Sequence, residues 1–337
     1  MTGPALAPPT AAVSAALALL PAAPGVYRMR DGRGRVVYTG RSGDLRARVR
    51  SYWRDLRDRP HLARMLRSVA WVEPTVCESE HEAALFERHL LMGRRPPYNR
   101  TTGVEQLVHL RLRTEPGAPS LDPVVLEPGG APGGELYGPY LGWEPTRLAS
   151  AALNRLFPIR YTASGLDPSR RELARSRGVG ERDRPTLASR MRAVLERRPR
   201  ALAGALARLT ELRDHEAANL QFEAAAELQR QLDALRWIAQ ARPRPAAIGD
   251  VDVWALGGSA ALLLRIRSGD LEDCVVCSAD GMGGYYAGRP RPGRVLTCGA
   301  GPAAGADEAA WLAVAEANAS LAERLIAAGA RPLSWPG

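Results

Sequence analysis

The chain has 337 residues, of which 45% are apolar, and its formal charge at pH 7 is +10. All 46 basic residues are arginine, which excludes reactions that need a lysine amine, such as Schiff-base formation. Four scattered cysteines exclude a secreted disulfide framework, so we expect a cytoplasmic protein of two or three domains.

Arginines cluster in two parts of the chain. Residues 28–67 hold 13 arginines against four aspartates, and residues 158–200 hold 12 arginines against five acids. Because a guanidinium group binds two phosphate oxygens at once, these clusters favour a polyanionic partner. A solvated basic face is the alternative for either run taken singly.

The N-terminal segment is apolar but interrupted by prolines. The first 27 residues carry no charged side chain, and the apolar run at 11–20 is shorter than the roughly 18 residues that a membrane span needs. A basic region, which a secretory signal would need, is missing. We expect residues 1–23 to form a leader helix that packs on the first domain, and we expect no membrane contact.

Residues 24–100 alternate strand and helix patterns and predict one compact α/β domain. Two β-prone runs, 25–30 and 35–40, flank the turn sequence Asp-Gly-Arg-Gly at 31–34. With the turn centred on residues 32 and 33, Tyr27 falls opposite Tyr38, and the two phenols meet. Gly25 and Gly40 would then leave room for the backbone of a ligand.

Two predicted helices follow the hairpin. Asp44 is the expected N-cap of the first, on which Arg48 lies beside a buried apolar stripe. The second opens with a capping box at 79–82, and on it Glu87 lies on an apolar face. A carboxylate there needs an arginine or a metal ion as its partner, so a structural salt bridge is the alternative to a metal site.

The rest of the chain predicts further helices and strands, and the fold class is mixed α/β. Residues 101–185 form a connecting region with strand-like runs at 108–113 and 124–127, a helical stretch at 145–156 and a basic linker at 161–185. Residues 186–240 are helical. Residues 246–337 predict a small α+β segment with strands at 251–256, 260–267 and 271–278 and a helix at 309–328. Alternation along the third strand places Cys274 and Cys277 on opposite faces, against a zinc site.

Five motifs in register resemble the GIY-YIG nuclease domain, in the version found at the N-terminus of UvrC excision-repair endonucleases. They are Gly25-Val26-Tyr27, Tyr38-Thr39-Gly40, Arg48, Glu87 and Asn99. The phrases at 24–29, 45–52 and 95–99 are similar to UvrC at the same relative spacing.

The resemblance implies hydrolysis of a DNA phosphodiester with one divalent metal ion, Mg²⁺ or Mn²⁺, held by Glu87. Tyr38 would take the proton from the attacking water, and Tyr27 would position Tyr38 or the metal-bound water. Tyr52 is a secondary candidate. Arg48 would stabilise the charge of the transition state. Because a phenol has a pKa of about 10, the base role requires nearby cations to lower it, and we expect the arginines to do so.

Further site residues follow from the same resemblance. Asn99 would orient groups at the site. Arg41 stands where the family usually has lysine, and Thr39 stands where it has isoleucine, so we expect Arg41 to act as a cation on phosphate or on a tyrosine. Four arginines are candidate DNA contacts: Arg28, Arg46, Arg50 and Arg54.

Residues 201–238 resemble the UVR helical hairpin that docks on UvrB. Two short helices with a narrow apolar face bury little on their own, which favours a partner surface, although an ordinary helical hairpin is the alternative. Gln229-Arg230 replaces the family's usual Arg-Asp pair. The candidate contacts are Leu220, Phe222, Glu223, Ala225, Leu228 and Leu232.

Two features of UvrC are not expected here. UvrC often carries a cysteine cluster for an iron-sulfur centre after the nuclease domain, whereas residues 162–273 contain no cysteine, so we expect no cluster. The C-terminal half of UvrC supplies an RNase H-like site, whereas the segment after residue 250 is short, so we expect no second active site here.

These features predict a truncated UvrC-like endonuclease, in the manner of the homologue Cho, that makes one incision on the 3′ side of a lesion in a UvrB–DNA complex. We expect a monomer associated with the nucleoid. The alternatives are a non-catalytic adaptor that binds DNA and UvrB, and a GIY-YIG nuclease that works with another partner, such as an exonuclease.

Overall fold

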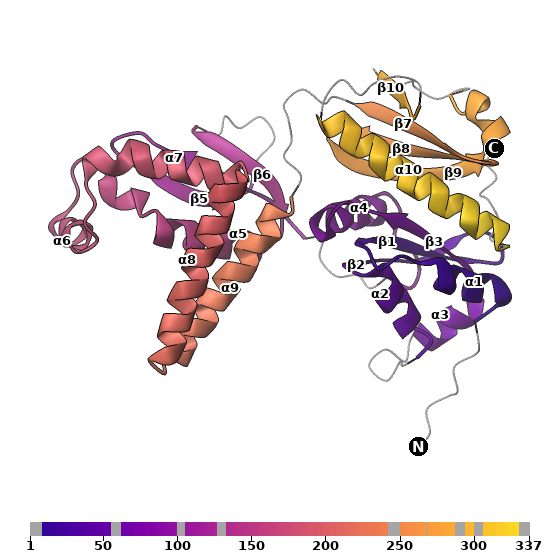
Figure 1. Cartoon of the computed structure of the whole chain (residues 1–337), viewed down its shortest axis with the longest axis horizontal. Coiled ribbons are helices and arrows are strands. Elements are labelled where there is room, and N and C mark those ends of the chain that lie inside the picture. Colours follow the sequence, from indigo (N-terminus) through magenta and orange to yellow (C-terminus); the bar gives the residue numbers. More distant parts are fainter. Residues whose placement is uncertain are drawn as a thin grey trace. The chain divides into compact units, whose positions relative to one another are not determined.

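The computed structural model describes residues 9–54, 62–99, 105–126, 133–241, 250–267, 269–286, 294–299 and 306–329. The chain forms two compact units (Figure 1). The first unit joins residues 1–104 with 244–337, and the second unit is residues 105–243. The predicted fold class, mixed α/β, is confirmed. No helix among the described ranges is long and apolar enough to cross a membrane.

A three-stranded antiparallel sheet lies at the centre of residues 24–100. Its order is β2-β1-β3, with β1 at Gly25–Asp31, β2 at Val36–Ser42 and β3 at Val69–Val76. One face packs on α1 (Ala11–Leu19), α2 (Leu45–Ser51) and α3 (Leu62–Ser68), through a cluster that includes Tyr27 and Met29. Val26 points to the other face, where it packs with Phe86 of α4 (Glu80–Gly93).

The β1–β2 hairpin has a different register from the predicted one. Tyr27 faces Gly40, and Tyr38 faces Met29, so the prediction that the two tyrosines lie directly opposite each other is wrong. They are diagonal neighbours on one face instead, and their ring centroids are 6.3 Å apart. The phenols therefore still gather, but along the diagonal of the hairpin.

The turn explains the shift. Asp31 accepts hydrogen bonds from the backbone N–H groups of Arg33 and Arg35, at 3.0 Å each. The chain reverses through Gly34, whose φ of 82° is the left-handed conformation that closes a three-residue loop. A bulge after Met29 then displaces the paired residues further.

Local helix signals are found where the sequence predicts them. Asp44 caps α2 by accepting a hydrogen bond from the N–H of Ala47 at 2.9 Å. Ser79 caps α4 by accepting from the N–H of Glu82 at 3.1 Å. The Glu82 carboxylate reaches the N–H of Glu78 at 2.6 Å, one residue beyond the N-cap that a capping box would use.

The C-terminal residues form a second sheet that packs on the first. Its order is β10-β7-β8-β9, with β7 at Val251–Gly257, β8 at Ala260–Arg267, β9 at Asp270–Ser278 and β10 at Arg294–Thr297. A short 3-10 helix, η3 (Ala279–Gly284), follows β9, and α10 (Ala306–Ala327) closes the segment. Cys274 and Cys277 belong to different clusters on the two faces of this sheet, as predicted.

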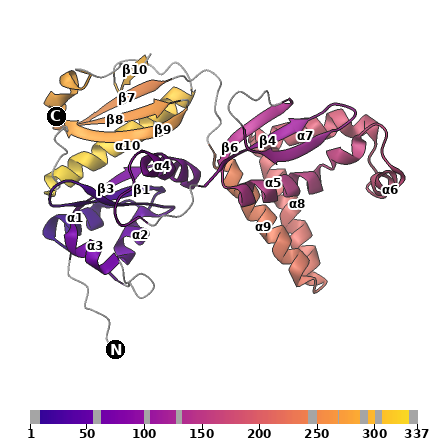
Figure 2. The same cartoon turned by 180° about the vertical axis from the view of Figure 1, so that it is seen from behind.

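This C-terminal segment is part of the same compact unit as residues 24–100, which the sequence did not indicate. Figures 1 and 2 show α10 and β9 beside α4 and β3. One apolar cluster contains Val26 and Phe86 together with Leu262, Leu264 and Trp311. Residues of the C-terminal segment therefore cover α4 and the second face of the β2-β1-β3 sheet.

The second unit has a sheet of order β5-β4-β6, with β4 at Leu107–Arg113, β5 at Ser120–Val124 and β6 at Glu135–Leu141. Its helices are α5 (Trp143–Leu156), α6 (Pro168–Ser176), α7 (Arg184–Leu195), α8 (Pro199–Ala218) and α9 (Phe222–Ala239), with 3-10 turns η1 (Ile159–Thr162) and η2 (Glu181–Asp183). Residues 161–185, expected as a linker, instead contribute to four of these helical elements. Residue 127 of the predicted strand at 124–127 lies outside the described residues.

Candidate active site

Three tyrosines from three elements meet on one face of the β2-β1-β3 sheet. The hydroxyl groups of Tyr27 and Tyr52 are 2.7 Å apart and share a hydrogen bond. The ring centroid of Tyr38 lies 6.3 Å from that of Tyr27 and 5.9 Å from that of Tyr52. Tyr27 and Tyr52 are 1% and 2% exposed, whereas Tyr38 is only half-buried, so Tyr38 is the phenol of the three that solvent reaches.

Gly40 makes room for this cluster. A Cβ atom at Gly40 would come within 2.4 Å of the hydroxyl oxygen of Tyr27. The space beside Gly25 is also filled, because a Cβ atom there would meet the carbonyl oxygen of Thr75 at 2.3 Å. The expectation that both glycines leave room for a ligand is therefore wrong: protein atoms occupy both spaces.

Burial makes the three phenols weaker acids than free tyrosine. It raises the pKa of Tyr27 to about 12, with the neighbouring Tyr38 adding to the rise and the Tyr52 hydrogen bond and the Arg48 charge opposing it. Burial likewise raises the pKa of Tyr38, and Tyr52 and Glu87 add to the rise while Arg48 opposes it. The expectation that the surrounding arginines lower these pKa values is wrong for the protein alone, because the loss of hydration outweighs them.

Two charged groups of opposite sign border the tyrosines. The guanidinium carbon of Arg48 lies 5.2 Å from the centre of the Tyr52 ring, which is cation–π range. From α4, the Glu87 carboxylate faces β2, where its Oε2 lies 3.3 Å from the Nε of Arg41. The structure therefore brings Tyr27, Tyr38, Tyr52, Arg48, Arg41 and Glu87 to one neighbourhood.

Asn99 is tied to the backbone of β2 rather than to a side chain of the cluster. Its Oδ1 accepts from the N–H of Thr39 at 2.9 Å, and its Nδ2 donates to the carbonyl oxygen of Thr39 at 2.7 Å. Thr39 lies between Tyr38 and Gly40 on the edge strand. Asn99 thus holds the part of β2 that carries the exposed phenol.

This constellation lies within the residues that match a known domain family. Residues 23–100 match the family of UvrC-like GIY-YIG domains. The chain carries a UvrC-like GIY-YIG domain. The resemblance seen in the five motifs is confirmed.

Relatives named UvrABC system protein C extend the similarity beyond the GIY-YIG domain. The chain is 32% identical to the protein from Pseudomonas putida (strain W619) over 282 residues, which are 76% of this chain and 44% of that protein. The protein from Pseudomonas fluorescens (strain SBW25) is 29% identical over 316 residues, covering 82% of this chain and 49% of the relative. The matched part of the chain therefore covers less than half the length of these curated relatives.

Among solved structures, the GIY-YIG domain is similar to the N-terminal endonuclease domain of UvrC from Thermotoga maritima, crystallised with its catalytic magnesium ion. The identity is 30%, the match covers 25% of this chain and 91% of that domain, and the TM-score is 0.23.

The donor atoms of the GIY-YIG domain suit an Mg²⁺ or Mn²⁺ ion that takes few of its ligands from the protein. Within the described ranges, no three His, Cys, Asp or Glu side chains come together as a metal cluster. Glu87 supplies one carboxylate beside the Tyr38 phenol. Mg²⁺ keeps several waters and binds through one or two carboxylates together with substrate phosphates, so a single glutamate fits this ion better than it fits zinc or calcium.

The arginines expected to bind DNA are divided by the structure. Arg28 is 8% exposed and forms ion pairs with Glu73 and Asp273, so its predicted phosphate contact is wrong. The Nε groups of Arg46 and Arg50 donate to the carbonyl oxygens of Leu20 and Leu17, near the end of α1. The terminal nitrogens of Arg46 and Arg50 are not part of these bonds, so both side chains stay candidates for phosphate contact. The exposed Arg54 is the third candidate.

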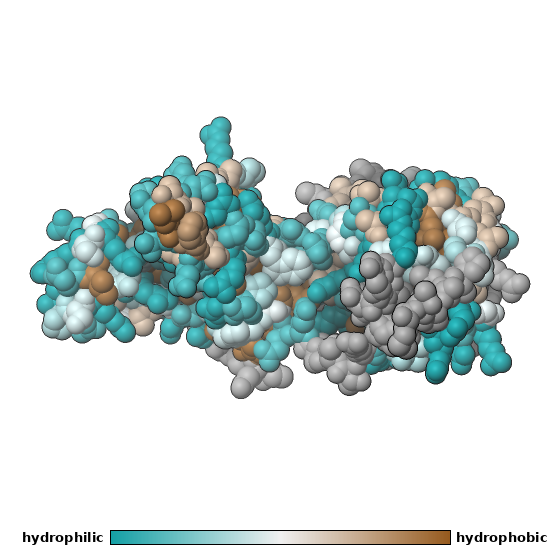
Figure 3. All heavy atoms as spheres, turned by 90° about the horizontal axis from the view of Figure 1, so that it is seen from below, coloured by the Kyte–Doolittle hydropathy of each residue, from teal (hydrophilic) through white to brown (hydrophobic). Residues whose placement is uncertain are grey.

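The predicted partner residues also divide into two groups. Leu220 and Phe222 lie at the bend between α8 and α9 and are 72% and 66% exposed, and a brown patch marks this tip on the left of Figure 3. Glu223 beside them is exposed. Ala225, Leu228 and Leu232 are buried, so their predicted partner contacts are wrong. The reason is that α9 packs on α5 as well as on α8, and Leu228 and Leu232 belong to the core of the second unit.

Proposed function

We propose that the chain is a metal-dependent DNA endonuclease that makes a single incision on the 3′ side of a lesion in a UvrB–DNA complex. The observation that carries the proposal is the group of three tyrosines bordered by Arg48 and by the Arg41–Glu87 pair. Hydrolysis of a phosphodiester needs a proton acceptor, a cation at the developing charge and a carboxylate for the metal, and residues of the types suited to these tasks lie here, which supports the proposal.

Tyr38 is the proposed proton acceptor. It is the half-buried member of the cluster, so part of its side chain is open to solvent, while the buried Tyr27 and Tyr52 share a hydrogen bond. Its raised pKa means that Tyr38 is neutral in the protein alone at neutral pH. A divalent ion on Glu87 would supply the positive charge that favours the deprotonated phenol and would polarise the phosphate.

Arg48 is the proposed partner of the phosphate. Its guanidinium group is half-buried over the Tyr52 ring, and the three phenols keep its pKa above the usual range although burial opposes this. It therefore stays charged throughout the reaction, which a group that stabilises negative charge must do. Asn99 acts as a positioning residue because it holds both backbone groups of Thr39.

We propose damaged DNA and UvrB as partners because the relatives are named as proteins of the UvrABC system. The exposed apolar residues Leu220 and Phe222 at the hairpin tip support a protein partner there, since large apolar side chains at an exposed bend are typical of contact surfaces. The arginines near α2 support a DNA path that leads to the site.

The test is nicking of a duplex that carries one defined lesion, with UvrB loaded and Mg²⁺ or Mn²⁺ present. We expect one product cut on the 3′ side of the lesion. Glu87→Gln and Tyr38→Phe should each lower the rate constant by roughly 100-fold or more, since general-base catalysis alone contributes about 10²–10⁴-fold. Arg324→Ala, which removes an exposed arginine on α10 outside both arginine clusters, serves as the control and should retain most of the rate.

The two variants separate the possible outcomes. If the unchanged chain binds the UvrB–DNA complex but makes no nick, the chain is an adaptor and the proposed activity is wrong. If Glu87→Gln and Tyr38→Phe nick as fast as the unchanged chain, the reaction takes place elsewhere in the protein.

A further inference from the structure

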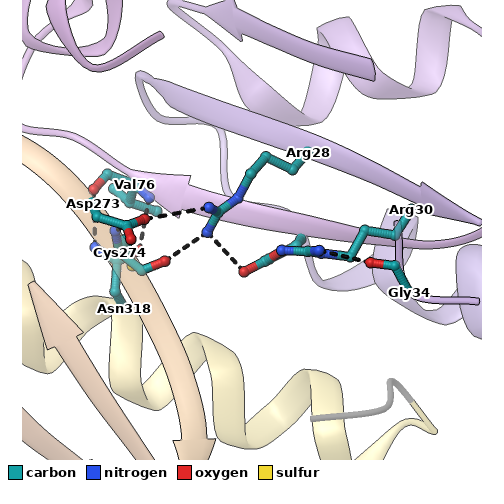
Figure 4. A network of polar contacts seen from close by, with 8 residues as sticks. Arg28, Arg30, Gly34, Val76, Asp273, Cys274 and Asn318 are labelled. Atoms are coloured by element: carbon teal, nitrogen blue, oxygen red, sulfur yellow. Dashed lines mark hydrogen bonds and ion pairs between the residues drawn. The ribbon is translucent and has the colours of Figure 1, made fainter. Parts of the chain in front are cut away.

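The C-terminal sheet is joined to the catalytic strand of the GIY-YIG domain by a buried guanidinium group. Arg28 on β1 donates from Nη2 to the carbonyl oxygen of Cys274 on β9 at 2.6 Å and to Oε1 of Glu73 on β3 at 2.8 Å. Its Nη1 lies 3.5 Å from Oδ1 of Asp273 on β9. Figure 4 shows this side chain extending from β1 toward Asp273 and Cys274. One arginine therefore contacts β3 and β9 from the strand that carries Tyr27.

The charges around this arginine balance. Arg30 donates from Nε to the other carboxylate oxygen of Glu73 at 2.6 Å. Two guanidinium groups thus meet two carboxylates, Glu73 and Asp273, and only Asp273 comes from the C-terminal segment. Without Asp273, Arg28 would remain mostly buried with one ionic partner fewer, which is a costly arrangement in a protein interior.

An asparagine makes the second connection. Asn318 on α10 is 2% exposed, its Oδ1 accepts from the N–H of Val76 at 2.7 Å, and its Nδ2 donates to the carbonyl oxygen of Val76 at 2.9 Å. Val76 ends β3, one edge of the sheet. Asn99 makes the same pair of bonds with Thr39 on β2, the opposite edge. Both edges of this sheet are thus held by an asparagine amide, Asn99 from the end of the GIY-YIG domain and Asn318 from the C-terminal segment.

The apolar contacts reach the helix that carries Glu87. β9 packs against α4, and Val26 and Phe86 share one buried cluster with Leu264 and Trp311 of the C-terminal segment. Phe86 is the neighbour of Glu87 in the sequence. The C-terminal segment therefore supports both β1, with Tyr27, and α4, with the candidate metal ligand.

We propose that the described residues of the C-terminal segment, within 250–329, position the nuclease site. The positioning residues are Asn318 and Arg28, which acts through its ion pair with Asp273. This inference rests on the proposed function. It assigns to the C-terminal segment the task of fixing the distance between the tyrosine cluster on the sheet and Glu87 on α4. Neither Arg28 nor Asn318 touches the groups proposed to react.

The experiment compares full-length Asp273→Ala and Asn318→Ala with two matched controls. Glu272→Ala removes the neighbouring acid on β9, and Ser320→Ala removes an exposed polar group on α10. Two quantities are measured at a temperature at which circular dichroism finds every variant folded: the nicking kinetics, and hydrogen exchange in residues 25–31 and 80–93, with residues 107–124 of the second unit as the internal reference. The milder Asp273→Asn and the uncharged Asn318→Ser replace any variant that does not fold.

We expect Asp273→Ala and Asn318→Ala to lower kcat at least tenfold with KM for DNA within twofold, because the site is misaligned while the DNA surface is intact. Exchange in 25–31 and 80–93 should become faster, and exchange in 107–124 should not change. The controls should match the unchanged chain. A kcat within twofold for both test variants overturns the proposal, as does a loss confined to KM.

This design separates the inference from the proposed function. If the unchanged chain does not nick, the proposed function fails and the exchange measurement decides the inference alone. In that case, unchanged exchange in 25–31 and 80–93 in both variants overturns the coupling, and faster exchange confined to these segments supports it.

Discussion

The contact between Arg41 and Glu87 links a departure from the family pattern to the candidate metal ligand. Arg41 stands where the resemblance to the family leads us to expect lysine, and its Nε lies 3.3 Å from the Glu87 carboxylate. A guanidinium group at this distance neutralises the charge that a metal ion would use. In the protein alone, the arginine therefore competes with a metal for the same oxygen atom.

We expect Arg41→Ala to raise the affinity of the DNA-free protein for Mn²⁺ by about three- to tenfold, because the removal of a partly exposed cation beside a carboxylate favours another cation there. Titration calorimetry with Mn²⁺ measures this. Arg54→Ala removes the same charge from an exposed position and should leave the affinity unchanged. Equal affinities for all three proteins would show that Arg41 does not compete.

The same position tests whether charge or shape matters during incision. If the positive charge beside Glu87 is what matters, Arg41→Lys should preserve nicking to within about threefold, because lysine keeps a cation at this position. If lysine fails as completely as alanine, the guanidinium shape is required at this site.

Among the elements, α8 ends in a conformation that its sequence disfavours. The N–H of Gln221 donates to the carbonyl oxygen of Glu216 at 2.9 Å, and that of Leu220 donates to the carbonyl oxygen of Ala217 at 3.0 Å, the two bonds of a Schellman motif. Leu220 has a φ of 60° at the position where glycine is usual. A strained leucine that is also 72% exposed suits a contact surface better than a cap.

Leu220→Gly should therefore stabilise the second unit by about 0.5–1 kcal/mol while weakening the proposed binding to UvrB. Urea unfolding and a UvrB binding isotherm measure the two effects. Leu173→Ala on α6, where the leucine is 46% exposed, is the apolar control and should leave UvrB binding unchanged. A stabilised Leu220→Gly protein that binds UvrB at full strength would remove the hairpin tip from the interface.

At the scale of the whole molecule, one of the two compact units is discontinuous in the sequence. Residues 105–243 form one unit, and the other unit is built from the residues on both sides of it. All buried residues of the main cluster of the second unit lie between Leu110 and Ala241. The clusters of the first unit mix residues from both ends of the chain, such as Leu45 with Leu321 and Val26 with Trp311.

This arrangement predicts how fragments behave. A 105–243 fragment should unfold cooperatively with nearly the same midpoint as in the full chain, since its core is complete. A 1–104 fragment should be less stable, because the face of the sheet with Val26 and Phe86 loses its cover. Calorimetry of both fragments checks this, and a 1–104 fragment as stable as the full chain would contradict it.

Much of the candidate site could be predicted from the sequence because its signals are local. The caps at Asp44 and Ser79, the positions of β1 and β2 and the opposite faces of Cys274 and Cys277 follow from spacing within a few residues. The motif spacing also determined the domain family. Such features depend on backbone geometry that neighbours in the chain decide.

Only the tertiary structure decided the features that depend on distant residues. The bulge after Met29 sets the hairpin register, and burial rather than the arginines controls the pKa of Tyr27. Arg28, expected to contact DNA, is instead buried in an ion pair with Asp273, which lies far along the chain. By itself, the sequence determined that the positive charge is carried by arginine alone. Folding decided which guanidinium groups stay at the surface and which are buried with carboxylates, because that depends on which acids the fold brings within reach.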